Sequence, residues 1–498
     1  MRAFFLLALF ICSNFLLAQE SNIFLDRSFW KTSPDIKTVE QKIAEGNDPV
    51  ALNPFAFDAV VYATLENAPF TTIKHLLSIK GNEVNKITHD GRNYLMWAAY
   101  KGNLELMQYL IDQGSQTDIV DDHGYNLMTF AAVAGQQNPA VYDVVLKNGG
   151  KINDTNRAGA NSLLLLSMHL EGETMLNYFK EKGLDLNSKD HEGNGLFNYA
   201  AKMGNIKMMD KYIEMGLDHQ NLNKNGGNAM IFASQGYRRY TNPLNVYEYL
   251  ESKGVEPNVV TKTGKTPLHG IAYRTKDFAI FEYFINRGVD INQADDNGNT
   301  AFINAVSGSN NEIAKQLLPQ TKDINAANDD GYSALTYAVR RNNEELFELL
   351  LTNNADVQVV DKKGNNLMYH AFDAFDKKEK DIFEKHIAGL RAKNVSCKGQ
   401  QAGGNTLLHL AVEKGNAFLI DQSIEWGVNI DQKNNDGLTP LHLAAMKAKN
   451  NKVLIQLLGY GADKNILTDF DESAFDLALE NELLGRGEDV QFLKRDSK

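Results

Sequence analysis

Short apolar segments recur in pairs along most of the chain, and polar turns separate them. In residues 295–327, a polar stretch ends at Gly298, and the mostly apolar segment 300–306 follows. After a polar break at 308–311, a second segment at 312–318 has apolar residues three and four positions apart. This pattern predicts two short helices and a turn in which glycine suits a positive φ. Because helices this short are marginal alone, we expect successive pairs to stack.

The pair recurs with a period of about 33 residues. Successive turn glycines are 33 to 40 residues apart, and Asp471 continues the series. The marking glycines are Gly91, Gly124, Gly159, Gly193, Gly226, Gly264, Gly298, Gly331, Gly364, Gly404 and Gly437. A period of this length is typical of repeat proteins, in which each unit contacts its neighbours. We predict about 12 full or nearly full repeats and a degenerate first one.

The internal motifs of these units resemble the ankyrin repeat. Thr266–His269 and Thr439–His442 carry the Thr-Pro-Leu-His core, and Thr406–His409 is close to it. The tails Gly288–Asn292 and Gly461–Asn465 fit the same family. The resemblance implies an all-α repeat solenoid of helix-turn-helix units with β-hairpin-like turns, 12–13 repeats in all. Other units depart from the Pro and His, for example at 93–96 and 333–336, and we expect weaker caps there.

The first residues differ from the rest of the chain. A positive start at Arg2 precedes an apolar run, and Ala18 is a small residue before a polar segment. This is typical of a secretory signal peptide spanning residues 1–18, and it is short for a membrane anchor, which needs about 20 apolar residues. Cleavage would leave a net charge of −13 and Cys397 as the remaining cysteine. No stable membrane span and no intramolecular disulfide would then remain.

The two ends of the repeat array predict capping segments. We expect residues 19–52 to form an N-terminal extension with a capping helix over 35–45, since Pro34 and Asp35 suit a helix start. Residues 53–86 are a degenerate first repeat, with helices near 59–67 and 70–79. The solenoid is predicted to cover 53–485, its final unit beginning at 469–481, and a polar tail follows at 486–498. Polar outer faces on terminal repeats keep such arrays soluble.

The sequence contains no motif that indicates catalysis or a cofactor. Lys262–Thr266 is not a phosphate-binding loop, because Val259 stands where that motif needs glycine. His269, His409 and His442 occur once per repeat, which is not the spacing of metal ligands. In ankyrin repeats this histidine bonds the backbone near the turn. The turn acids lack the ligand series of a calcium loop, and Cys397 has no catalytic neighbours. We therefore predict no enzyme, no cofactor and no metal site.

The family resemblance places binding residues at the turn tips and at the exposed ends of the first helices, on the concave side. Tyrosine and arginine are favoured interface anchors. The insertion Gly236–Pro243, which contains the run Tyr237–Tyr240, is the strongest local candidate, and a second insertion lies at 376–403. Each of these residues could equally be an ordinary solvated side chain. The candidates for partner binding are Tyr237, Arg238, Arg239, Tyr240, Tyr273, Arg274, Tyr332, Arg340, Arg341, Tyr100 and Tyr125.

These observations favour a non-enzymatic scaffold that binds a protein partner. The net charge of −12 and the lack of a basic stripe argue against nucleic acid. The chain resembles exported, signal-peptide-bearing ankyrin-repeat proteins of bacteria, which implies a periplasmic location. One alternative is a secreted effector that binds a foreign or host protein, and a remote one is an enzyme hidden in an atypical repeat. The repeats name neither the partner nor the oligomeric state.

Overall fold

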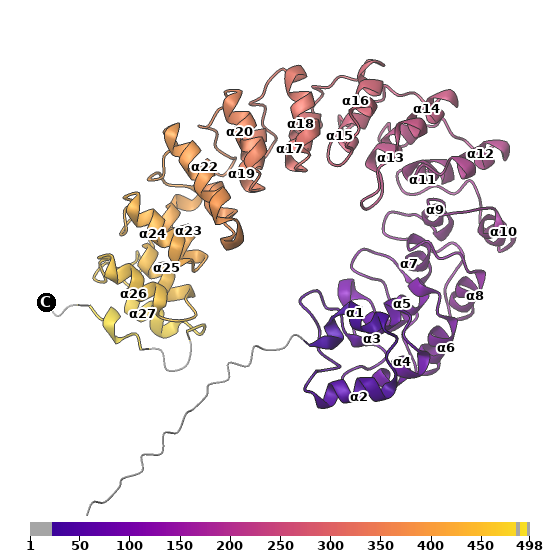
Figure 1. The fold of residues 1–498 in the computed structure, drawn as a ribbon, viewed down its shortest axis with the longest axis horizontal. Helices are drawn as coiled ribbons and strands as arrows, with labels where there is room; N and C mark the ends of the chain where they lie inside the picture. Colours follow the sequence, from indigo (N-terminus) through magenta and orange to yellow (C-terminus); the bar gives the residue numbers. More distant parts are fainter. Residues whose placement is uncertain (1–21, 485–488, 496–498) are drawn as a thin grey trace, which may run out of the picture. The chain divides into compact units, whose positions relative to one another are not determined.

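The computed structural model describes residues 22–484 and 489–495. The chain divides into two compact units, residues 1–224 and 225–498. Both consist of paired helices (Figure 1), and the described residues contain no β-strand beyond isolated bridges. The all-helical stack of paired helices predicted from the repeat period is therefore confirmed. The predicted signal peptide lies outside the described residues.

The N-terminal unit contains a capping segment followed by five helix pairs. The segment starts with a 3₁₀ turn at Ile23–Leu25. The helices of this unit are α1 (Arg27–Lys31), α2 (Ile36–Ala44), α3 (Ala59–Leu65), α4 (Phe70–Leu77), α5 (Tyr94–Lys101), α6 (Leu104–Asp112), α7 (Leu127–Val133), α8 (Pro139–Lys147), α9 (Ser162–Leu166), α10 (Thr174–Glu181), α11 (Leu196–Lys202) and α12 (Ile206–Glu214).

The C-terminal unit contains seven helix pairs and a last single helix. In Figure 1 the first helix of each pair lies on the inner side of this unit and the second helix on its outer side. The helices are α13 (Ala229–Gln235), α14 (Leu244–Ser252), α15 (Pro267–Ile271), α16 (Phe278–Ile285), α17 (Ala301–Ser307), α18 (Asn311–Leu317), α19 (Ala334–Arg340), α20 (Glu344–Thr352), α21 (Leu367–Asp373), α22 (Lys380–Ala392), α23 (Leu407–Glu413), α24 (Ala417–Glu425), α25 (Pro440–Lys447), α26 (Lys452–Gly459) and α27 (Ala474–Glu480).

The core of each unit runs along the stack of first helices. In the C-terminal unit α13 packs on α15, α15 on α17, α17 on α19, and the series continues to α27. The first helices are buried almost all round; every residue of Ala301–Val306 in α17 is buried. Leu163–Leu166 in α9 and Trp97 in α5 are also buried. A helix apolar on all sides needs neighbours on both sides, and the adjacent repeats supply them.

The turn before each first helix is built by local hydrogen bonds. Asp295 Oδ1 accepts from the backbone N–H groups of Asn297 and Asn299 at 3.0 and 2.9 Å. Gly298 has φ 77°, and a Cβ there would lie 2.9 Å from Cα of Asn328 in the next repeat. Asp296 N–H donates to Thr263 O of the preceding turn at 3.0 Å. The turn aspartate therefore holds its own backbone, as expected, and each turn bonds the one before it.

The repeated histidine has the structural role that the family resemblance implied. His409 Nδ1 accepts from the Thr406 N–H at 3.1 Å, and its Nε2 donates to Leu438 O of the next turn at 3.0 Å. Burial lowers the pKa of His409, so the neutral imidazole that these bonds require is favoured. His269 and His442 make the corresponding bonds.

The two departing units have weaker caps, as expected, because each keeps one bond of the capping box and lacks the reciprocal bond that His409 makes to the N–H of its cap residue. Asn93 Oδ1 accepts from the N–H of Met96 at 3.1 Å, and Ser333 Oγ accepts from the N–H of Thr336 at 3.3 Å. Asparagine and serine are good N-cap residues, because their short side chains reach the N–H groups of the first turn. These units therefore keep the bond to the first-turn N–H group and lose the reciprocal bond to the N–H of the cap residue.

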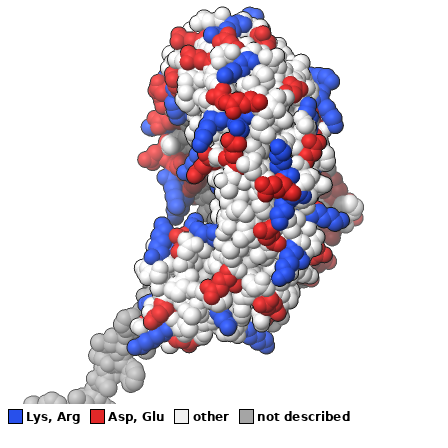
Figure 2. All heavy atoms as spheres, turned by 90° about the vertical axis from the view of Figure 1, so that its right-hand side faces the viewer, with Lys and Arg blue, Asp and Glu red and all other residues white. Residues whose placement is uncertain are grey.

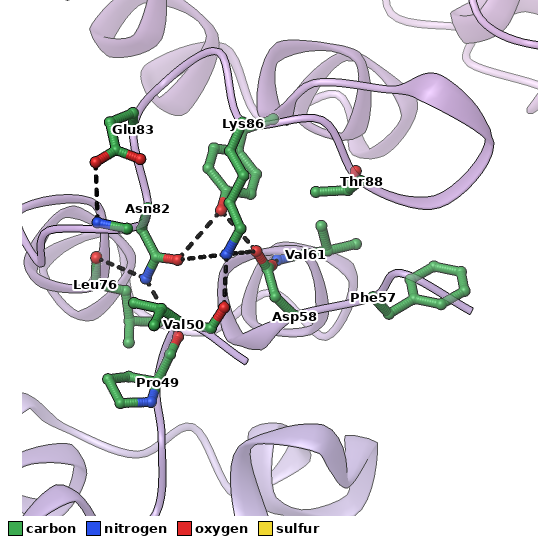
Figure 3. Close-up of polar contacts among 12 residues, drawn as sticks. Pro49, Val50, Phe57, Asp58, Val61, Leu76, Asn82, Glu83, Lys86 and Thr88 are labelled. Atoms are coloured by element: carbon green, nitrogen blue, oxygen red, sulfur yellow. Dashed lines mark hydrogen bonds and ion pairs between the residues drawn. The ribbon is translucent and has the colours of Figure 1, made fainter. Parts of the chain in front are cut away.

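A buried polar network joins the N-terminal extension to the first repeat (Figure 3). Lys86 Nζ lies 2.9 Å from Asp58 Oδ2 and donates to Val50 O at 2.8 Å and to Asn82 Oδ1 at 3.0 Å. The hydroxyl of Tyr94 donates to the same Asp58 oxygen at 2.6 Å. Burial and this carboxylate raise the pKa of Tyr94. One lysine therefore connects the extension, the first repeat and the second.

The helix bounds agree closely with the predicted ones at the N-terminal end. The capping helix predicted over 35–45 is α2, and Asp35 caps it through the N–H of Thr38 at 2.8 Å. In the insertion at 376–403, residues 377–379 form a 3₁₀ turn, residues 380–392 form the long second helix α22 of 13 residues, and the longer loop predicted around 392–403 follows this helix. No helix within 22–484 or 489–495 has the length and apolar character needed to cross a membrane.

Candidate functional site

A cavity of the C-terminal unit lies at the ends of four consecutive first helices, α13, α15, α17 and α19. It has a volume of about 600 Å³, within the usual range for ligand sites. We call it the inner groove. It is lined by Gln235, Thr241, Gly270, Tyr273, Arg274, Ser307, Gly308, Ser309 and Arg341. This lining lacks aliphatic side chains and offers guanidinium, hydroxyl and amide groups, so the groove suits a polar ligand.

The predicted insertion forms a small hairpin beside the groove. Tyr237 and Tyr240 exchange backbone hydrogen bonds of 3.1 and 2.9 Å, and Arg238 and Arg239 form the two-residue turn between them. Arg238 has φ 54°, and Gly236 has φ 59° with ψ −165°, a conformation that glycine alone adopts readily. The side chain of Asn242 donates to Ala233 O at 2.9 Å and holds the hairpin on the end of α13.

Two arginines of the groove are held by backbone carbonyl groups. Arg274 Nη1 donates to Arg238 O, at the tip of the hairpin. Arg341 Nε donates to Ser307 O at the end of α17, at 3.0 Å. Both side chains belong to exposed residues. Each tether uses one N–H group of a guanidinium that has five, so the remaining donors and the charge are available to a ligand.

Tyr273 occupies the middle of the site. Its hydroxyl donates to Asn304 Oδ1 at 2.9 Å, and Asn304 is held in turn by His269 O, to which it donates at 3.2 Å. Burial of the ring raises the pKa of Tyr273, so the hydroxyl stays protonated. The residue remains 42% exposed, and its ring presents a flat surface. Such a tyrosine can contact a ligand with little loss of conformational freedom.

A second, smaller cavity continues the groove toward the turns. Its volume is about 290 Å³, and it shares Gln235, Gly270 and Tyr273 with the inner groove. Lys265 lies at its turn end. A Cβ at Gly270 would lie 2.6 Å from Ser234 Oγ, so glycine at this position lets α13 and α15 approach closely. The two cavities follow α15 from its turn to its far end.

Tyr332 and Arg340 form a separate cluster on the neighbouring repeats. The Arg340 guanidinium carbon lies 4.8 Å from the centre of the Tyr332 ring, and Nη1 lies 3.1 Å from His370 Nδ1. Oδ2 of Asp373 lies 3.9 Å from Nη1 of Arg340. Burial and the Arg340 charge lower the pKa of His370 to about 4, so its Nδ1 is an acceptor at neutral pH. This arginine has partners within the chain.

Tyr100 and Tyr125 belong to the N-terminal unit. The centre of the Tyr100 ring lies 5.5 Å from that of the Phe130 ring and 6.1 Å from that of the Trp97 ring. Tyr100 is half-buried. The backbone N–H of Tyr125 donates to Asp121 Oδ1 at 2.8 Å, within a turn that Arg92 also contacts. The candidate residues are thus distributed over both units. The structure brings Tyr273, Arg274, Arg341 and the 237–240 hairpin together.

Sequence reasoning missed several residues that line the groove, among them Gln235, Ser307 and Ser309. Each stands at or just beyond the last turn of a first helix. The signal that identified Arg341 could have identified them, since all stand at or just after the end of a first helix, at nearly the same position of the repeat. Serine and glutamine are common on any protein surface, so these residue types alone do not indicate a binding site.

Charge is distributed differently on the outer side of the molecule. On the face shown in Figure 2, positive and negative side chains alternate, and neither sign dominates. Cations of the second helices pair with carboxylates of the neighbouring repeat, as Lys211 does with Glu173 at 3.1 Å and Arg287 with Glu251 at 2.7 Å. Isolated exposed pairs of this kind contribute little to stability. The arginines of the inner groove have no such arrangement.

Comparison with known families agrees with the repeat architecture. The model for ankyrin repeats (3 copies) matches residues 60–156, 238–328, 268–361, 308–382 and 367–468. Together these segments span more than half of the chain. The chain belongs to the ankyrin-repeat family. The inner groove lies within the matched part, where the ankyrin repeats follow one another without interruption from 238 to 468.

Individual relatives of these ankyrin repeats match over short segments. A 70-residue segment is 41% identical to the putative ankyrin repeat protein FPV031 of Fowlpox virus, covering 14% of this chain and 20% of that protein. Ankyrin repeat protein nuc-2 of Neurospora crassa is 25% identical over 202 residues, which are 39% of this chain and 18% of that protein. An L-asparaginase of Dirofilaria immitis is 24% identical over 138 residues, 28% of this chain and 23% of the enzyme. The chain spans about a fifth of the length of these relatives.

Among solved structures, the ankyrin repeat domain of human ASB11 aligns with a TM-score of 0.38 at 23% sequence identity. The alignment covers 46% of this chain and 96% of that domain.

Proposed function

We propose that this protein is a non-enzymatic scaffold that binds a protein partner through the inner groove and the adjacent 237–240 hairpin. The observation that carries the proposal is the convergence of Tyr273, Arg274 and Arg341 with an insertion that interrupts the repeat period. Tyrosine and arginine supply much of the binding energy in protein interfaces. Ankyrin-repeat domains typically serve as protein-binding scaffolds.

The scaffold is proposed to be non-catalytic, since ankyrin-repeat proteins are usually not enzymes. The similarity to an L-asparaginase covers 23% of that enzyme at 24% identity. The inner groove offers arginine, hydroxyl and amide groups without a nucleophile next to a base. Turnover by the purified protein that is lost on changing Cys397 would contradict this part of the proposal.

We propose that the protein acts after export, with the periplasm as its site and residues 1–18 as its signal peptide. The support is the composition of the first 18 residues and the single cysteine that would remain after cleavage. A secreted effector that binds a foreign protein is the alternative. Fractionation of the producing cells separates the two locations, and recovery of the mature chain in the medium would favour the effector.

The binding surface can be tested with a photoreactive phenylalanine analogue placed at Tyr240 or at Tyr273. We expect either position to crosslink one partner protein when the purified mature chain is mixed with the native envelope fraction. Tyr460, at the end of the second helix α26, is the matched control, because its exposure of 46% is close to the 41% of Tyr240 and the 42% of Tyr273. The same adduct at Tyr460, or none at the groove positions, would show that the partner binds elsewhere.

A second variant checks that the captured protein depends on this surface. It replaces Tyr237, Arg238, Arg239, Tyr240, Tyr273 and Arg274 by alanine. All six lie outside the buried core, so we expect a helical circular-dichroism spectrum like that of the parent chain. Retention of the partner by this folded variant would exclude the groove and the hairpin as the binding surface.

A further inference from the structure

We infer that the inner groove recognises an acidic polypeptide segment, whose aspartate or glutamate carboxylates bind Arg274 and Arg341. This inference rests on the proposed function and names the chemistry of the partner. A guanidinium matches a carboxylate with two parallel hydrogen bonds, and such charge-assisted pairs are the stronger ones. The inference follows from three features of the groove: its charge, one unusual serine and its length.

No carboxylate of the described residues neutralises the arginine charges of the groove. Other arginines meet carboxylates: Arg27 pairs with Glu66, and Arg92 pairs with Asp121 at 2.8 Å. Among the described residues, no carboxylate lies within ion-pair distance of Arg274 or Arg341. Their tethers are carbonyl oxygens, which orient the guanidinium groups without cancelling their charge. In a chain with a net charge of −12, two arginines held in this way form a local site for an anionic ligand.

One residue of the lining is in a conformation that favours glycine. Ser309 has φ 53° and follows α17 at the position that Gly204 and Gly415 occupy after α11 and α23. Those two glycines have φ 63° and 58°. A serine is less stable than glycine in this left-handed region. It adds a hydroxyl group to the groove next to Gly308, and this hydroxyl can donate to a carboxylate oxygen.

The shape of the site favours an extended chain over a small anion. The inner groove and the turn-side cavity share three residues and follow α15 from Lys265 to Arg274. Positive side chains therefore stand at both ends, and the exposed ring of Tyr273 lines both cavities. The turn-side cavity is also lined by Asp295, whose carboxylate accepts hydrogen bonds from two backbone N–H groups of its own turn. A peptide lying along this path would place one acidic side chain at Arg274 and Arg341 and another near Lys265. A free anion would use one end alone.

The test uses the mature chain and a fluorescent eight-residue peptide of alternating glutamate and glycine. We expect fluorescence anisotropy to report binding that weakens with added salt, and no binding of the same peptide with glutamine in place of glutamate. Arg274→Ala and Arg341→Ala should each weaken binding about tenfold, the effect of losing one charge-assisted hydrogen bond pair. Lys265→Ala should weaken it about threefold, since this lysine is a single exposed charge.

The matched control is Arg157→Ala. Arg157 is exposed and donates to a backbone carbonyl of the preceding turn, Asp122 O, at 3.1 Å, as Arg274 does to Arg238 O. It lies in the N-terminal unit and lines none of the cavities described above. We expect this variant to bind the glutamate peptide as the parent does. Equal thermal unfolding of all variants and the parent shows that a loss of binding is not a loss of fold.

Several outcomes would overturn the inference. They are equal binding of the glutamine peptide, unchanged binding after Arg274→Ala and Arg341→Ala together, and no binding at millimolar glutamate peptide. If a phosphoserine–glycine peptide binds more than tenfold tighter than the glutamate peptide, the groove recognises phosphorylated residues instead of carboxylates. Competition by inorganic phosphate alone, without binding of either peptide, would reduce the groove to a small-anion site. If the peptides do not bind but Tyr240 and Tyr273 still crosslink a partner, the proposed scaffold function is retained and the proposed preference for an acidic segment is rejected.

Discussion

At the scale of single residues, His386 differs from the three buried histidines that cap first helices. His269, His409 and His442 use both ring nitrogens in hydrogen bonds to the backbone. His386 in α22 is fully buried, packs 4.3 Å from the centre of the Phe347 ring, and has no hydrogen-bond partner at either nitrogen. Burial lowers the pKa of His386 to about 4, and the nearby Glu344 opposes this shift only partly.

His386→Leu is expected to make the stability less dependent on pH. A histidine in the unfolded chain has a pKa of about 6.5, so between pH 6.5 and 4 the unfolded state binds the extra proton. The stabilising effect of the neutral ring is complete above pH 6.5 and is lost as the pH falls toward 4. Between pH 7 and pH 4.5, the free energy of unfolding of the parent should therefore fall by about 2 kcal/mol more than that of the variant, as measured by urea unfolding. His191→Leu, at an exposed histidine, is the control, and an equal loss in parent and variant would contradict the prediction.

Lys86→Met is expected to lower the free energy of unfolding of the N-terminal unit by about 3 kcal/mol. The reason is that the Asp58 carboxylate has no exposed surface and would lose the ammonium group that lies 2.9 Å away. The double variant Lys86→Met with Asp58→Asn should recover part of this loss, because no buried charge remains. Lys80→Met, at an exposed lysine of the same repeat, should change the stability little. A loss equal to that of Lys80→Met would show that the network in Figure 3 is not stabilising.

At the scale of elements, the ends of the first helices determine the binding surface. Most first helices have seven or eight residues, so their ends fall at similar places in every repeat. The α13–α14 connection departs from this rule, because Gly236 turns the chain into the 237–240 hairpin. A short insertion at the end of one helix therefore changes the groove without disturbing the stack.

Gly236→Ala is expected to lower the free energy of unfolding by about 1–2 kcal/mol more than Gly415→Ala does. The two glycines have nearly the same φ, 59° and 58°, and both follow a first helix. A Cβ at Gly236 would lie 2.3 Å from Tyr240 O, whereas nothing lies within 4 Å of a Cβ at Gly415. Chemical denaturation of the two variants measures the difference. Equal losses would mean that the hairpin adjusts without cost.

At the scale of the whole molecule, the chain consists of two compact units. Repeat arrays are held by contacts between neighbours, so long arrays can lose the all-or-none unfolding of small domains. The tryptophans are divided between the units, with Trp30 and Trp97 in the N-terminal unit and Trp426 in the C-terminal unit. Each unit can therefore be followed by its own fluorescence.

Two unfolding transitions are expected in urea. Trp426→Phe leaves fluorescence from the N-terminal unit alone, and Trp30→Phe with Trp97→Phe leaves the C-terminal unit alone. The two signals should have different midpoints, and Lys86→Met should shift the first midpoint but not the second. Coincident midpoints that shift together would show that the chain unfolds as one cooperative body.

The sequence by itself determined the repeat period, the pairing of helices and the family, and the family resemblance implied the role of the turn histidines. These features depend on interactions within about 35 residues, namely apolar spacing, caps three residues apart and bonds between successive turns. The sequence also indicated Tyr273, Arg274 and Arg341, because their positions in the repeat are exposed.

The tertiary structure alone decided which exposed residues act together. Arg274 reaches the hairpin carbonyl 36 residues before it, and Arg341 reaches the end of α17, 34 residues before it. The unpaired ring of His386, the Asp58–Lys86 network and the extension of α22 were likewise not visible in the pattern of residues. The physical reason is that the repeat period specifies which repeats are neighbours, while the packing of side chains between them specifies which polar groups meet.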